Sequence, residues 1–118
     1  AQARTIEVRS GETAVTYALE DNAAADALLA QLPLTIEIED YSTNEKIFYP
    51  PQALETAGAP AASGGAGVLA YYAPWGDVVL FYDGFSENAS LFALGRAVSG
   101  AESIRDLTGT VTVAVAEG

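Results

Sequence analysis

The stretch GVLAYYAPWGDVVLFY, residues 67–82, decides the fold of this chain. Two short apolar runs, Val68–Tyr72 and Val78–Tyr82, flank the segment APWG, whose proline and glycine are typical of a tight turn. Both runs are apolar on both faces, as strands are when each face of their sheet is covered. We therefore predict a β-hairpin at the centre of the hydrophobic core.

Alternating apolar and polar residues predict further strands on either side of this hairpin. The clearest is Leu34–Glu39, whose apolar side chains occupy one face and whose acidic ones occupy the other. An N-terminal hairpin is predicted from Arg4–Arg9 and Thr13–Leu19. The remaining predicted strands are Ile47–Tyr49, Phe92–Val98 and Thr110–Ala116, with Gly95 as a bulge or a point of close backbone approach.

One helix is predicted over residues 22–32, where alanine and leucine recur at helical spacing. Asp21 or Asn22 is the expected N-cap, and Pro33 ends the helix because the residue before a proline avoids the helical region. A short helical segment is expected near 101–107. With about eight strands, this predicts a mainly β fold: a closed antiparallel barrel with the helix at one end, since closure leaves no open sheet edges.

Length and charge narrow the possible partners. The 118 residues are the size of one domain, 1–118, and they carry 16 acidic and 5 basic side chains for a formal net charge of -11. Such a surface repels phosphate backbones and anionic lipids, so we expect neither nucleic acid nor a membrane as partner. A peptide or protein partner stays open, and the sequence does not indicate the oligomeric state.

The chain contains no Cys, His or Met. This absence excludes disulfides, thiol and histidine nucleophile chemistry, and His-ligated zinc or haem. Residues 1–3, Ala-Gln-Ala, fit either the end of a removed export signal or an engineered end, and we expect them to be disordered or processed. Localisation is accordingly open between the bacterial cytoplasm and export to the periplasm or exterior.

Several segments follow one another in a specific order. Residues 22–34 read NAAADALLAQLPL, and the sequence NEK at 44–46 leads to an aromatic pair and a proline. GVLAYY at 67–72, VLFY at 79–82 and LGR at 94–96 come next. Over nearly the whole chain, this succession resembles the bacterial cyclophilin-like fold family of small domains.

The resemblance implies a flattened antiparallel barrel of about eight strands with a helix at one end. It does not imply isomerase activity, because true cyclophilins use an arginine, a phenylalanine, a glutamine and a histidine around their proline-binding groove. This chain has no histidine, and no stretch matches the motif that carries the catalytic arginine. No catalytic residue is therefore carried over. Some relatives are joined to flavodoxin-type domains.

The candidate ligand-binding residues are Arg96, Tyr72, Trp75, Tyr82 and Phe92. Arg96 is expected on the same strand face as Phe92, Leu94 and Val98. It would recognise an anion or carbonyl in the barrel mouth, form an ion pair with a carboxylate, or lie exposed at the strand end. A cluster of aromatic residues along the central hairpin either forms a cleft or fills the core. Its members are Tyr71, Tyr72, Trp75, Tyr82 and Phe85, of which Trp75 is the best candidate for exposure.

The acidic residues Glu37, Glu39, Asp40 and Glu45 gather near one strand end, and we interpret them as a solvated surface. The segment from Asp40 begins like a calcium loop but lacks the required glycine and closing glutamate, so neither a metal nor a cofactor is predicted.

Three functions remain open at this point. The leading hypothesis is a non-catalytic binding or accessory module. The alternatives are a divergent peptidyl-prolyl isomerase built on Arg96 and the aromatic residues, and a partner or regulator of a flavodoxin-type redox protein.

Overall fold

The computed structural model describes residues 5–20, 23–41, 45–54, 56, 61–62, 66–83 and 90–115. The predicted helix N-cap, Asp21 or Asn22, and the N-terminal residues 1–3 lie outside this part of the chain. The elements are, in order, β1 (Thr5–Ser10), β2 (Thr13–Leu19), α1 (Ala23–Leu29), β3 (Leu34–Tyr41), β4 (Glu45–Phe48), β5 (Val68–Tyr72), β6 (Asp77–Phe81), β7 (Leu91–Ser99), the 3-10 helix η1 (Ala101–Asp106) and β8 (Gly109–Val115).

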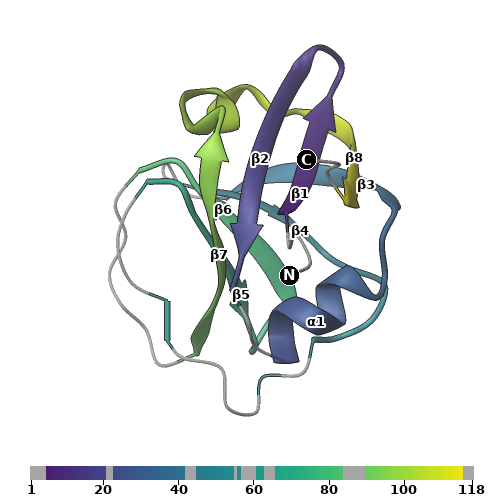
Figure 1. The fold of residues 1–118 in the computed structure, drawn as a ribbon, viewed down its shortest axis with the longest axis vertical. Coiled ribbons are helices and arrows are strands. Elements are labelled where there is room, and N and C mark those ends of the chain that lie inside the picture. Colours follow the sequence, from purple (N-terminus) through teal and green to yellow (C-terminus); the bar gives the residue numbers. More distant parts are fainter. Residues whose placement is uncertain are drawn as a thin grey trace.

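The strands form a closed antiparallel barrel in the order β1-β2-β7-β5-β6-β4-β3-β8, which confirms the predicted fold class. The barrel closes through β8, which pairs with β1 at Val8↔Val113 and with β3 at Ile36↔Val111. In Figure 1 the β1–β2 hairpin points to the top of the view, and α1 lies near the opposite end. The predicted β5–β6 hairpin forms with the register Ala70↔Val79 and Tyr71↔Val78.

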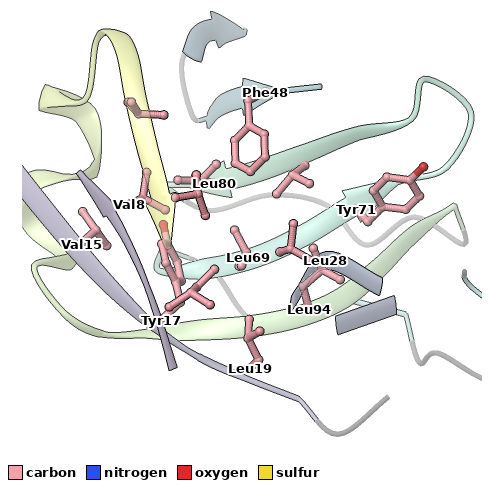
Figure 2. Packing of buried hydrophobic residues seen from close by; sticks show 14 of the residues in the cluster. Val8, Val15, Tyr17, Leu19, Leu28, Phe48, Leu69, Tyr71, Leu80 and Leu94 are labelled. Atoms are coloured by element: carbon pink, nitrogen blue, oxygen red, sulfur yellow. The ribbon is translucent and has the colours of Figure 1, made fainter. Parts of the chain in front are cut away.

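The apolar faces of the β5–β6 hairpin pack into two separate clusters. Leu69, Tyr71 and Leu80 belong to the main cluster inside the barrel, together with Leu28 of α1 and Leu94 of β7. Figure 2 shows these side chains packed between the strands and the helix. The alternate residues of the hairpin face outward and join residues from other segments in a second cluster. Its members are Ile47, Ala62, Val68, Ala70, Val79, Phe81 and Leu91. The hairpin is apolar on both faces because both faces are covered.

The helix is shorter than predicted, because its last turn tightens. The amide of Ala30 still donates to the carbonyl of Asp26, but Gln31 and Leu32 donate to the carbonyls three residues before them. The side-chain amide of Gln31 is bonded to the chain after β4: it donates to the carbonyl of Gln52 (3.0 Å) and accepts from its N–H (3.1 Å).

Tyr17 places an unpaired hydroxyl inside the barrel. Its side chain lies in the main cluster (Figure 2) and is fully buried, and its oxygen has no hydrogen-bond partner among the described residues. Burial raises the pKa of this phenol far above its usual range. The phenol of Tyr71 is also buried, but it accepts a hydrogen bond of 3.2 Å from the Leu54 N–H.

The two tyrosines give a matched prediction for stability. We expect Tyr17→Phe to raise the free energy of unfolding by about 1 kcal/mol, since a buried polar group without a partner costs free energy. Tyr71→Phe should lower the free energy of unfolding by about 1 kcal/mol, because it leaves the Leu54 N–H unpaired. Urea denaturation of both variants measures the difference. Equal losses in the two variants would show that the Tyr17 hydroxyl is hydrogen-bonded in solution.

Candidate ligand-binding site

A pocket of about 180 Å³ lies on the outer face of the barrel, over β4, β5, β6 and the start of β7. Its position follows from strand alternation: Val79 and Phe81 of β6 belong to the outer cluster, and Asp77 shares their face. The apolar floor is completed by Leu91. The full lining is Glu45, Tyr72, Trp75, Asp77, Val79, Phe81 and Leu91.

The aromatic part of the pocket is built by the turn between β5 and β6. The amides of Trp75 and Gly76 both donate to the Tyr72 carbonyl, at 3.3 and 2.9 Å, and Gly76 adopts a φ of 70° that suits glycine. This turn brings the Tyr72 and Trp75 rings edge to face, with centroids 5.5 Å apart and planes at 79°. Trp75 remains 48% exposed, so it is available to a ligand.

The pocket also holds two carboxyl groups. Asp77 is 1% exposed, and its Oδ1 has no hydrogen-bond partner in the described structure. Desolvation raises the pKa of Asp77 to about 6, although a hydrogen bond from its own backbone opposes the shift. Desolvation raises the pKa of Glu45 to about 7, and the nearby charge of Asp77 adds to the increase. Two carboxyl groups are thus held in a largely apolar surrounding.

The structure brings two of the five predicted ligand-binding residues, Tyr72 and Trp75, into this pocket. Tyr82 is half-buried against the main cluster, and the Cζ atom of Arg105 lies 5.5 Å from its ring centroid. Phe92 is half-buried and pairs with Tyr71 and Ala61, away from the pocket lining. Tyr71 is a core residue, and Phe85 lies outside the described residues.

The prediction that Arg96 shares a strand face with Phe92 and Leu94 was wrong, whereas Arg96 and Val98 are both exposed. Leu94 of β7 is an extra residue between the pairs Ala70↔Ala93 and Leu69↔Gly95, and this bulge reverses the alternation that the sequence suggested. Leu94 therefore points into the core with 0% exposure, whereas Arg96 is exposed and pairs with Val68, at the opposite end of β5 from Tyr72. It does not line the pocket, so its role in binding stays a prediction.

Comparison with known proteins places the chain in a family. The family model described as "Cyclophilin-like family" matches residues 8–116. The chain belongs to the cyclophilin-like family. Among solved structures, the cyclophilin-like barrel resembles the solution structure of the hypothetical protein AF2241 from Archaeoglobus fulgidus. The TM-score is 0.75 at 20% identity, covering 97% of this chain and 95% of that chain, which shows a shared fold. No curated protein matches the sequence.

Sequence reasoning about this cyclophilin-like chain missed both carboxyl groups of the pocket. Glu45 was grouped with the solvated acids; Glu37 and Glu39 are indeed exposed, but Glu45 is half-buried. Asp77 opens a five-residue strand that is otherwise apolar and has the same parity as Val79 and Phe81. An acid in an apolar strand could have marked Asp77 as a site residue. That inference, however, requires knowing that the outer face of β6 is covered.

Other features of the cyclophilin-like barrel offer less to a ligand. A second recess, between α1 and the chain after β4, is lined by small or polar residues, and its Gln31 amide is already hydrogen-bonded. In the described part of the chain, no group of three or more acidic side chains is placed to hold a metal ion. None of the described helices is long and apolar enough to cross a membrane.

Proposed function

We propose that this cyclophilin-like domain is a non-catalytic binding module, which holds a peptide or protein segment through one side chain seated in the outer-face pocket. The observation that carries the proposal is the pairing of two aromatic rings, the half-buried Tyr72 and the exposed Trp75, with an apolar floor on the same face of the barrel. Exposed tryptophan and tyrosine beside a pocket are typical anchors of binding surfaces.

The size of the pocket supports a peptide rather than a free metabolite. At about 180 Å³ it is smaller than the roughly 300–1,000 Å³ typical of sites that enclose a drug-sized molecule. A site of this size suits one side chain of a longer segment. The rest of such a segment would lie on the surface beside Trp75.

The alternative of a divergent prolyl isomerase depends on an arginine near the substrate. Arg96 is exposed on the outer face and lies outside the pocket lining, so no observation favours this alternative over binding. The alternative of a flavodoxin-type partner rests on the family resemblance alone.

A peptide array followed by an activity assay tests the proposal. We expect weak but saturable binding of some peptides, followed by the fluorescence of Trp75, which is the only tryptophan of the chain. Trp75→Ala, followed by NMR, should weaken the same binding about tenfold. The protease-coupled proline-peptide assay should show no rate above background. Peptide turnover that is lost in Arg96→Ala would support the isomerase alternative instead.

A further inference from the structure

We propose that the outer-face pocket selects a basic side chain, the lysine or arginine of a peptide partner, by placing its cation between Glu45, Asp77 and the two aromatic rings. This inference deepens the proposed function and rests on it: the binding module would recognise peptides by a positive charge carried on an apolar stem.

Asp77 is a buried acid with a carboxylate oxygen that no described residue hydrogen-bonds. Its carboxyl group lines the pocket, is almost completely removed from solvent, and leaves Oδ1 without a partner in the described structure. Burying a carboxylate is costly unless it is paired or hydrogen-bonded. Glu45 adds a second carboxyl to the same lining. A cation donated by a ligand would satisfy both groups at once.

The described basic residues of the chain all lie outside the pocket lining. Lys46 faces the barrel interior beside Leu80, and its Nζ lies 2.7 Å from Asp40 Oδ1. The Nε of Arg9 lies 3.1 Å from Glu7 Oε1, and Arg105 covers Tyr82. Arg96 is exposed beyond the pocket lining. Within the described residues, the protein therefore supplies no cation to Asp77, and the partner must bring one.

The remaining lining of the pocket suits the apolar stem and the charged end of a long basic side chain. Val79, Phe81 and Leu91 offer an apolar floor for the methylene stem of a long basic side chain. The faces of Tyr72 and Trp75 can attract an ammonium or guanidinium group, which aromatic rings bind through their negative faces. The net charge of -11 also draws basic partners toward the surface. A neutral apolar side chain would contact only the apolar floor and would leave both carboxyl groups without a cation.

The test uses acetylated and amidated alanine pentapeptides with a single central residue. Lysine is compared with norleucine, and arginine with citrulline, so that each pair differs mainly in charge. Binding is followed by ¹⁵N NMR of the whole chain. We expect each charged peptide to bind at least about tenfold more tightly than its neutral counterpart. The preference should weaken at high salt, and also as the pH falls from about 8 to about 5, because Glu45 (pKa about 7) and Asp77 (pKa about 6) take up protons over this interval.

Matched charge variants separate the pocket from general attraction. Glu45→Gln with Asp77→Asn should abolish the preference for the charged peptides. Glu12→Gln with Glu102→Gln removes the same charge from two exposed carboxyls outside the pocket lining and should leave the preference unchanged. An equal loss in both double variants would overturn the proposal, because the attraction would then be a property of the whole surface.

The outcomes also separate this inference from the proposed function. If charged and neutral peptides bind the pocket equally, the binding module stands and selection of a basic side chain is wrong. If neither charged peptide binds while an array peptide without lysine or arginine does, the binding module again stands and selection of a basic side chain is again wrong. If neither these peptides nor the array peptides bind, both the inference and the proposed function fail.

Discussion

Gly95→Ala is expected to lower the free energy of unfolding by about 3 kcal/mol, a large part of the stability of a domain of this size. A Cβ at position 95 would collide with the Ala18 carbonyl oxygen and would lie 3.0 Å from the Leu19 Cα. Both obstacles are backbone atoms of β2, which pairs with β7 at Leu19↔Gly95. They can move aside only by separating two paired strands of the barrel.

Gly11→Ala provides the control for this substitution. Unlike Gly95, Gly11 has a positive φ, 59°, but nothing lies within 4 Å of its added Cβ. In Gly11→Ala the free energy of unfolding should fall by only about 1 kcal/mol, the cost of a positive φ at a residue other than glycine. Urea denaturation measures both. A Gly95→Ala variant as stable as Gly11→Ala would contradict the close approach of β2 and β7.

The second large effect is a dependence of stability on pH that originates in the pocket. The pKa values of Asp77 (about 6) and Glu45 (about 7) are raised above the values of 3.8 and 4.5 for the unperturbed groups. As the pH rises through this interval, the unfolded chain loses these protons first, so the folded state binds more of them. The destabilising contribution of these two groups is therefore small near pH 4, grows as the pH rises toward 7, and is complete above about pH 8.

We expect the free energy of unfolding to fall by about 1 kcal/mol across this range, after allowing for solvent screening of the two groups. The double variant Glu45→Gln with Asp77→Asn should flatten the profile, because an amide mimics the protonated acid. The exposed pair Glu12→Gln with Glu102→Gln controls for the repulsion of a strongly negative chain. A profile that both double variants flatten equally would assign the dependence to net charge and not to the pocket.

Most of the barrel could be predicted from the sequence, because its elements are encoded by local patterns. Leu34–Glu39 alternates cleanly, and the β5–β6 hairpin is apolar except for Asp77, with proline and glycine between its strands. The bulge in β7 could not be placed with the same ease. Gly95 indicated an irregularity, but the reversed face of Arg96 depends on pairing with β5, which is a non-local contact.

The candidate site was only half predictable for the same reason. Tyr72 and Trp75 could be predicted as ligand-binding candidates because they are aromatic and lie at a turn. Asp77 and Glu45 did not, because an acid on a strand is normally solvated. Their environment is created by Phe81 and Leu91, which reach the same outer face from separate strands. Only the assembled sheet shows that this face is covered.

The central claim, that the outer-face pocket is the binding site of this domain, is tested most directly by mapping where a peptide binds. Backbone amide shifts of the ¹⁵N-labelled chain would be followed while the lysine pentapeptide is added. We expect the largest changes at Tyr72, Trp75, Asp77 and Val79, with little change at Gln31 and Gln52 beside α1. Changes centred on Gln31 and Gln52, or spread evenly over the barrel, would contradict the claim.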